Sequence, residues 1–176
     1  PTAPNTRSGL DLVNVPRTQF NEFPSLSSDG TTVAFTSGRS QALRTYVATA
    51  ALGQPLKNQS LLVPAGISDA TNKTLDELRA VISPDAATAV IVTPGATLAT
   101  QRAYYYVRAT TTATALTGDV LGVGQIMFSP ASDSVALEIV QSKANGADGV
   151  DQWVFAAKTA APGSLFQITS SGRRES

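Results

Sequence analysis

The chain alternates short apolar runs with tight polar turns, and one form of this pattern occurs three times. In each copy a serine ends an apolar stretch, a short polar turn follows, and a second apolar run begins. The copies lie at residues 24–36, 80–92 and 126–138. Two short apolar runs around such a turn predict a β-hairpin.

The spacing of these hairpins predicts a repeat architecture. Aligned on Ser27, Ser83 and Ser129, the copies are 56 and 46 residues apart, which is typical of a propeller blade rather than a helical solenoid. We therefore expect an all-β fold, a partial β-propeller of three four-stranded antiparallel blades. The predicted strands are 23–27, 33–37, 45–50 and 60–63, then 78–82, 89–93, 103–109 and 113–121, then 125–128, 135–141, 152–157 and 165–169.

The spacing of the three serine turns divides the chain into five parts. These are an N-terminal tail with an extra strand (1–19, strand at 10–15), blade 1 (20–72), blade 2 (73–121), blade 3 (122–170) and a C-terminal tail (171–176). No signal peptide is visible, and the first eight residues are expected to be an exposed polar tail left after processing or trimming.

Residues 74–82 carry a competing helix signal. Thr74 and Glu77 have the spacing of a capping box, and Leu75, Leu78 and Ile82 fall at helical intervals. The repeat phase places a strand over the second half, and Ser83-Pro84 ends any helix there. We expect one helical turn at most, followed by the strand.

The turn sequences resemble the repeat of the TolB-like β-propellers. The family's Ser-Pro-Asp-Gly tetrad appears here at residues 27–30, 83–86 and 129–132, and each copy is followed at the same offset by a small apolar triplet. The resemblance covers residues 20–170 and implies a propeller of the bacterial cell envelope, periplasmic or otherwise extracytoplasmic. Asp29 and Asp85 recur in equivalent turns, which favours a structural role over acid–base chemistry.

Composition excludes several kinds of chemistry. Thirteen basic and thirteen acidic residues give zero net charge with no basic stripe, so nucleic acid is not an expected partner. The chain contains no cysteine and no histidine, which rules out Cys/His zinc sites, cysteine nucleophiles and histidine-based triads within it. Its apolar runs are too short to span a membrane.

Three blades form an arc that leaves two sheet faces uncovered, and propellers usually close with more blades. Three explanations are open. The chain is part of a longer protein, another subunit covers the open ends, or two copies pair into a six-bladed ring. Each predicts a protein partner or self-association at those faces.

Two candidate sites stand out. Asn145, Asp148 and Asp151 supply oxygen donors around a glycine, the ingredients of a calcium loop, although the spacing is not that of an EF-hand. The alternative is a long polar hairpin. No other cofactor is expected.

The second candidate is aromatic. Tyr104, Tyr105, Tyr106 and Trp153 would form a partner-binding surface, or else pack between blades. In a strand, Tyr104 and Tyr106 share one face and Tyr105 takes the other.

The expected function is a non-catalytic protein-interaction scaffold or assembly subunit in the cell envelope. The alternative is the propeller portion of a larger hydrolase, a peptidase or glycosidase, whose catalytic residues lie outside this chain. No Gly-x-Ser-x-Gly elbow occurs among these residues. A calcium or ligand-binding module is the third possibility, as an addition to a scaffold.

Overall fold

The computed structural model describes residues 21–38, 42–69, 71–142 and 150–169. Within these residues, twelve strands form three four-stranded antiparallel sheets, which confirms the predicted fold class. Blade 1 contains β1 (Asn21–Leu26), β2 (Thr32–Ser37), β3 (Arg44–Thr49) and β4 (Lys57–Leu61). Blade 2 contains β5 (Arg79–Ile82), β6 (Thr88–Pro94), β7 (Gln101–Val107) and β8 (Thr112–Ala115). Blade 3 contains β9 (Gly122–Phe128), β10 (Ser134–Ser142), β11 (Val150–Lys158) and β12 (Phe166–Gln167).

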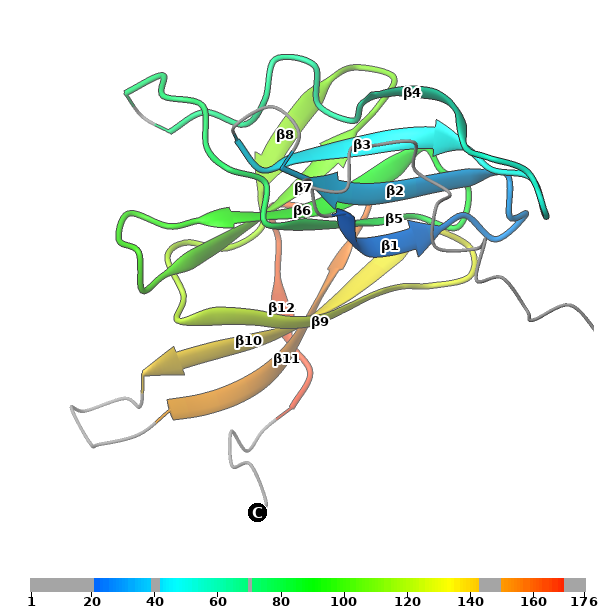
Figure 1. The fold of residues 1–176 in the computed structure, drawn as a ribbon. Coiled ribbons are helices and arrows are strands. Elements are labelled where there is room, and N and C mark those ends of the chain that lie inside the picture. The colour runs from blue at the N-terminus through cyan, green and yellow to red at the C-terminus, as the bar shows by residue number, and fades with distance from the viewer. Residues whose placement is uncertain (1–20, 39–41, 70, 143–149, 170–176) are drawn as a thin grey trace, which may run out of the picture.

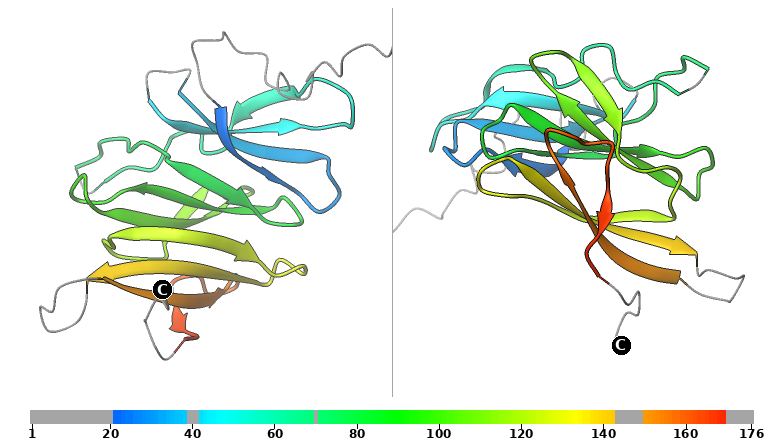
Figure 2. Two further views of the ribbon diagram at one scale, coloured as in Figure 1. Left: turned by 60° about the horizontal axis from the view of Figure 1, so that its bottom comes forward. Right: turned by 180° about the vertical axis from the view of Figure 1, so that it is seen from behind.

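The three blades stack face to face in chain order (Figures 1 and 2). Strands follow one another across each blade, so every blade-to-blade connection runs from a fourth strand to the first strand of the next sheet. These connections and the second-to-third strand loops lie at one end of the strands, which we call the crossover rim. The first-to-second and third-to-fourth strand turns lie at the other end, the hairpin rim.

Two apolar clusters fill the spaces between blades, because successive strand residues face opposite ways. In β6, Ala89 and Ile91 belong to the cluster between blades 1 and 2. Val90 and Val92 belong to the cluster between blades 2 and 3. The central sheet is therefore covered on both faces.

The tyrosines of β7 divide between the same clusters. Tyr106 lies in the cluster between blades 1 and 2, with Tyr104 packed against it. Tyr105 lies in the cluster between blades 2 and 3. The predicted alternation of these side chains is confirmed.

A buried carboxylate joins blade 1 to blade 2. Glu77 is fully buried, and its two oxygens accept hydrogen bonds from the Thr45 N–H (2.8 Å) and Arg44 Nε (3.1 Å). Burial raises the pKa of Glu77, and the hydrogen bonds from Thr45 and Arg44 oppose that shift. The neighbouring Asp76 accepts the Leu43 N–H at 3.0 Å, so both acids hold the start of β3.

The helical turn predicted at residues 74–82 does not form. Its backbone is hydrogen-bonded to other segments instead: the Leu75 N–H donates to the Ile67 carbonyl and the Glu77 N–H to the Leu43 carbonyl, both at 2.7 Å. Glu77, which suggested a helix cap, serves the contact between blades 1 and 2 instead. The strand predicted to follow is present as β5.

The fourth strands differ from the predicted ranges in each blade. Leu62 and Val63 leave the edge strand and are buried between blades 1 and 2. Leu116 and Val120 do the same between blades 2 and 3. Their apolar side chains are buried in the core, and Val120 forms an isolated antiparallel bridge with Gln101 rather than extending β8. The predicted strand at 10–15 lies outside the described residues.

The recurring serine has the same structural role in all three turns. Its Oγ donates to a nearby aspartate and accepts the backbone N–H five residues later. The serine–aspartate pairs are Ser27–Asp29 (2.6 Å), Ser83–Asp85 (2.5 Å) and Ser129–Asp133 (2.6 Å). The N–H donors are those of Thr32 (3.0 Å), Thr88 (3.0 Å) and Ser134 (3.1 Å).

The turns also contact one another along the hairpin rim. The Ser28 N–H and hydroxyl both donate to the Pro84 carbonyl, at 2.9 and 3.0 Å. The Asp85 N–H donates to Ser132 Oγ at 3.2 Å. The repeat therefore fixes each hairpin and also its contact with the next blade.

The position three residues after each serine has a positive φ: 71° at Gly30, 58° at Ala86 and 58° at Ser132. An added Cβ at Gly30 meets no atom within 4 Å, so Gly30→Ala tests this conformation alone. We expect a loss of about 1 kcal/mol in the free energy of unfolding, measured by urea denaturation. Gly118→Ala is the matched control, because Gly118 has equal space and no positive φ. Equal effects of the two substitutions would contradict this explanation.

The turn aspartates also predict acid sensitivity. The hydrogen bond from its serine lowers the pKa of each of Asp29, Asp85 and Asp133. Their stabilising contribution is therefore complete above the ordinary value of 3.8 and is lost as the pH falls through the folded-state pKa values. We expect the urea midpoint to drop between pH 6 and pH 3, and to drop less in a triple Asp→Asn variant. The same drop in both proteins would show that these carboxylates do not govern acid unfolding.

Candidate functional site

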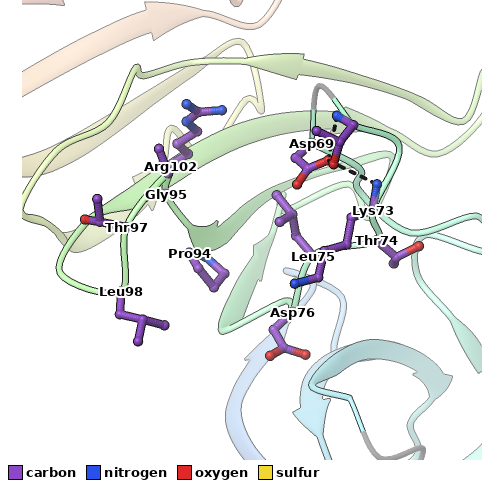
Figure 3. A pocket seen from close by; sticks show the side chains of 12 residues that line it. Asp69, Lys73, Thr74, Leu75, Asp76, Pro94, Gly95, Thr97, Leu98 and Arg102 are labelled. Atoms are coloured by element: carbon purple, nitrogen blue, oxygen red, sulfur yellow. Dashed lines mark hydrogen bonds between the residues drawn. The ribbon is translucent and has the colours of Figure 1, made fainter.

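A cavity of about 580 Å³ opens on the crossover rim between the β4–β5 connection and the β6–β7 loop. Figure 3 shows its two walls: Asp69, Lys73, Leu75 and Asp76 on one side, and Gly95, Thr97, Leu98 and Arg102 on the other. Two acidic and two basic side chains thus line the cavity, and its other lining residues are small or apolar.

The first wall is an acid-centred turn. Asp69 Oδ1 accepts the Thr71 N–H (2.8 Å), the Thr71 hydroxyl (2.6 Å) and the Lys73 N–H (3.0 Å). These bonds, with the nearby charge of Lys73, lower the pKa of Asp69. Asp69 is therefore a turn-forming carboxylate, held in its ionised form.

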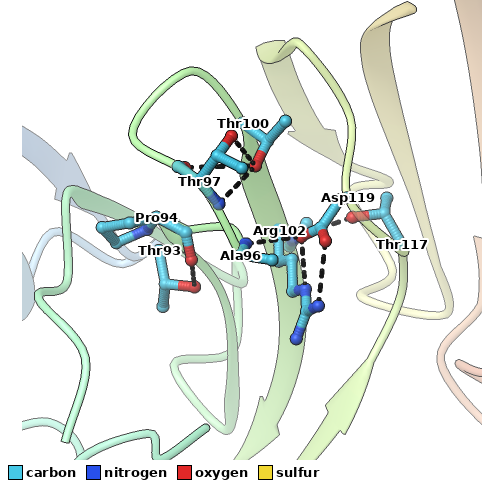
Figure 4. Close-up of polar contacts among 9 residues, drawn as sticks. Thr93, Pro94, Ala96, Thr97, Thr100, Arg102, Thr117 and Asp119 are labelled. Atoms are coloured by element: carbon cyan, nitrogen blue, oxygen red, sulfur yellow. Dashed lines mark hydrogen bonds and ion pairs between the residues drawn. The ribbon is translucent and has the colours of Figure 1, made fainter.

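The second wall is fixed by a two-bonded ion pair (Figure 4). Arg102 Nε donates to Asp119 Oδ1 at 2.6 Å and Nη2 to Oδ2 at 3.0 Å, while Asp119 Oδ1 also accepts the Ala96 N–H at 3.0 Å. The pairing lowers the pKa of Asp119 and raises that of Arg102. Gly95 lacks a side chain where a Cβ would collide with Thr100 and Asp119.

This set of groups is suited to holding polar groups rather than to proton transfer. A general acid needs a carboxyl that is protonated near neutral pH, and the hydrogen bonds at Asp69 and Asp119 favour the opposite. Among the described residues, no group of three acidic or other metal-binding side chains is placed to hold a metal ion.

The second candidate surface is the face of blade 3 that points away from blade 2. One apolar row crosses all four strands of this face through the paired residues Met127, Ala136, Ala156 and Phe166. Met127 is 64% exposed and Phe166 54% exposed. Beside the row, Glu138 lies with Val154 around a shallow hollow of about 330 Å³. We call this surface the open face.

The repeat shows what such a face does in blade 2. Met127 and Ala136 occupy the positions, counted from Ser129, that Val81 and Val90 occupy relative to Ser83. Val90 is completely buried against blade 3, and Val81 packs on the same cluster. At these positions, the open face of blade 3 is therefore equivalent to the face of blade 2 that blade 3 covers.

The outermost face of blade 1 is different. Phe35 and Ala48 point away from blade 2, since their neighbours Ala34 and Val47 belong to the cluster between blades 1 and 2. Both are nonetheless buried, with 2% and 3% exposure. Phe35 stacks on Tyr46 at 5.8 Å between ring centroids. Leu26, which pairs with Val33 on the same face, is 55% exposed, so this face is covered at Phe35 and Ala48 and exposed at the edge strand β1.

The predicted aromatic surface needs correction. Tyr105 and Tyr106 are only 2% and 1% exposed, because β7 lies inside a sheet covered on both faces, so neither ring is available to a partner. Tyr104 is half-buried and packs between blades. Trp153 is half-buried and pairs across strands with Ile139, on the side facing blade 2. A partner role for Tyr104 and Trp153 stays a prediction.

The predicted calcium loop is described only in part. Asp151 lies in β11 opposite Gln141, while Asn145 and Asp148 lie outside the described residues. Calcium binding therefore stays a prediction. The sequence analysis missed Met127, Glu138 and Phe166. Met127 could have been found by aligning blade 3 with blade 2 on Ser129 and Ser83, because it then falls on the position of Val81.

Comparison with known proteins agrees with this architecture. No protein-family model matches the chain, and neither does any curated protein sequence. Among solved structures, TolB from Acinetobacter baumannii is similar over 88% of this chain and 33% of its own, with 12% identity and a TM-score of 0.60. The β-propeller domain of the trilobed protease from Pyrococcus furiosus is similar over 86% and 43%, with 12% identity and a TM-score of 0.54. An oligogalacturonate lyase in complex with manganese is similar over 91% and 43%, with 11% identity and a TM-score of 0.58.

The chain has the fold of a TolB-like β-propeller segment. The resemblance predicted from the repeats is thus confirmed at the level of the fold. The segment spans a third to less than a half of the length of these three structures. In the described part of the segment, no helix is long and apolar enough to cross a bilayer.

The ion pair in the cavity wall predicts a local effect of Asp119→Asn. The Ala96 N–H keeps only a neutral acceptor, so its hydrogen exchange should accelerate about twofold to tenfold, as measured by NMR. The Ser83 N–H, bonded to the Thr88 carbonyl at the hairpin rim, is the internal control and should not change. Equal acceleration at both amides would indicate global destabilisation instead.

Proposed function

We propose that this chain is a non-catalytic protein-interaction scaffold that acts through the open face of blade 3. The observation that carries the proposal is the contrast between equivalent positions: Val81 of blade 2 packs on the cluster between blades 2 and 3, whereas Met127 at the same position of the last blade is 64% exposed. Large exposed apolar side chains on a sheet face, here Met127 and Phe166 on either side of the buried Ala156, mark interaction sites in soluble proteins.

The partner in this proposal is another β-sheet. The equivalent face of blade 2 is covered by a four-stranded blade, and sheets pack well on sheets of similar twist. A further blade in a longer chain and a blade of another subunit both meet this requirement. A head-to-tail ring of two copies fits less well, because it needs the outer face of blade 1, where Phe35 and Ala48 are already buried.

The chemistry of the crossover rim supports a non-catalytic role. Asp69 and Asp119 have lowered pKa values and hold loop N–H groups, so neither is suited to act as a general acid near neutral pH. We further propose that the protein works outside the cytoplasm, in the cell envelope, on the basis of its likeness to TolB alone.

A second candidate function is the propeller portion of a larger hydrolase. The similarity to the propeller domain of a protease favours it, as does the partial coverage of every structure compared above. In that case the catalytic residues belong to another domain, and the open face would contact a further blade of the same protein.

Photo-cross-linking from two positions tests the proposed function. A photoreactive amino acid replaces Met127 on the open face or, as control, Leu52, a fully exposed apolar residue on the hairpin rim. In cells that make the natural full-length protein, we expect adducts from position 127 and far fewer from position 52. Mass spectrometry of the adduct identifies the cross-linked sequence and so separates a further blade of the same protein from another subunit. Equal adducts from both positions, or none from position 127, would refute docking at the open face.

A further inference from the structure

The open face carries a carboxylate in a defined position beside its apolar row. Glu138 is half-buried in the middle of β10, and its Oε2 accepts the Gln125 N–H at 2.9 Å. It makes no other hydrogen bond and no ion pair with the described part of the chain. One oxygen is thus held against β9, and the second has no donor from that part of the chain.

The inner strand is shaped to receive this side chain. The β9–β10 register shifts between Leu137 and Ile139, so the backbone of β9 bulges beside Glu138. At Gly124, in the bulge, an added Cβ would collide with the carboxyl group and Cγ of Glu138. The absence of a side chain at Gly124 therefore leaves room for the Glu138 carboxylate beside β9.

Arg79 approaches the same bulge from the opposite side of blade 3. Its guanidinium donates to the carbonyls of Val123 and Gly124, which lie between blades 2 and 3. Its charge is close enough to interact with Glu138, since Glu138 offsets part of the lowering that burial imposes on the pKa of Arg79. Its hydrogen bonds, however, are given to the backbone, so Glu138 gains no donor from it.

Among the described residues, the other charged side chain on this face is Lys158. Lys158 pairs with Ser134 across β10 and β11, beyond the apolar row from Glu138. Its charge helps to lower the pKa of Asp133 in the adjacent turn. The centre of the open face is therefore apolar and anionic.

Covering such a face has a defined electrostatic consequence. A sheet packed over the apolar row removes water from Glu138, and a buried carboxylate without a partner is strongly destabilising. An arginine or lysine from the covering surface supplies hydrogen-bond donors to the second oxygen and a positive charge on the open side, in addition to that of Arg79. Surfaces that are apolar only, or acidic, are correspondingly disfavoured.

We infer that the open face selects a β-sheet that presents apolar side chains to the Met127–Phe166 row and an arginine or lysine to Glu138. This inference rests on the proposed docking function and adds the chemistry of the partner. The apolar row provides the contact area, and Glu138 favours partners with a basic side chain at that point.

Met127 is the single methionine of the chain, so a ¹³C-methyl-methionine label gives one NMR signal located on the open face. The purified chain is titrated with three probes of equal alkyl length: hexyltrimethylammonium, hexan-1-ol and hexanesulfonate. We expect all three to shift the Met127 signal, with the cation binding about threefold to fivefold more tightly than the alcohol, as for a partly exposed ion pair. The sulfonate should bind more weakly than the alcohol.

Two variants assign the preference to one carboxylate. Glu138→Gln keeps an acceptor for the Gln125 N–H and should abolish the preference for the cation while leaving hexan-1-ol binding unchanged. Glu22→Gln removes an exposed carboxylate from blade 1 and should leave the preference intact. Equal binding of cation and alcohol by the natural sequence, or a preference that survives Glu138→Gln, would overturn the inference but not the proposed function.

Two further outcomes separate the alternatives. If none of the probes shifts the Met127 signal, the open face is not available and both proposals fail. Light scattering on the same samples tests a second copy as occupant, and we expect a monomer. A dimer that persists in Glu138→Lys would overturn the inference, because the face would then be covered without a cation opposite residue 138.

Discussion

A β-sheet with apolar side chains on both faces must be covered on both, and this requirement governs the arrangement of the chain. Blade 2 satisfies it with blade 1 on one side and blade 3 on the other, and the residues of β6 from Ala89 to Thr93 are all buried. In β10 of blade 3, burial alternates instead: Val135, Leu137 and Ile139 are buried, and the residues between them are not. The burial of successive residues along a central strand thus shows whether its sheet is covered on one face or on both.

Polar contacts fix the angle and register of the stack at its two rims. At the crossover rim, Glu77 joins the start of β3 to the chain entering β5, and the adjacent Asp76 lines the cavity. At the hairpin rim, Ser28 and Asp85 connect each turn to the next. The cavity therefore lies where the connection between blades 1 and 2 meets the β6–β7 loop.

Much of the fold could be predicted from the chain because hairpins are local. The serine turns, their spacing and the division of Tyr105 and Tyr106 between two faces all follow from short-range pattern. The fourth strands could not be placed, because Leu62 and Leu116 are apolar for a reason outside their own blade. The helix signal at residues 74–82 was wrong for the same reason, since Glu77 binds a strand more than thirty residues away in sequence.

The candidate site was harder to predict. The tyrosines were conspicuous in sequence, yet burial removes Tyr105 and Tyr106 from consideration. Glu138 is unremarkable in sequence and becomes important only through Gly124, the bulge of β9 and the uncovered face around it. Such a site depends on contacts between strands and on a sheet that is absent from one side, and neither is visible in local pattern.

The one-sided support of the last blade also affects the energetics of folding. Sheets stacked in series are stabilised by themselves and by their neighbours, as in repeat proteins. Opening blade 2 breaks two interfaces, whereas opening blade 3 breaks one and leaves blades 1 and 2 in contact. Detachment of a terminal blade, blade 1 or blade 3, is therefore cheaper than opening blade 2, and for blade 3 it exposes the cluster between blades 2 and 3. A sheet bound to the open face opposes that detachment by mass action, so that assembly and the completion of folding are a single linked equilibrium.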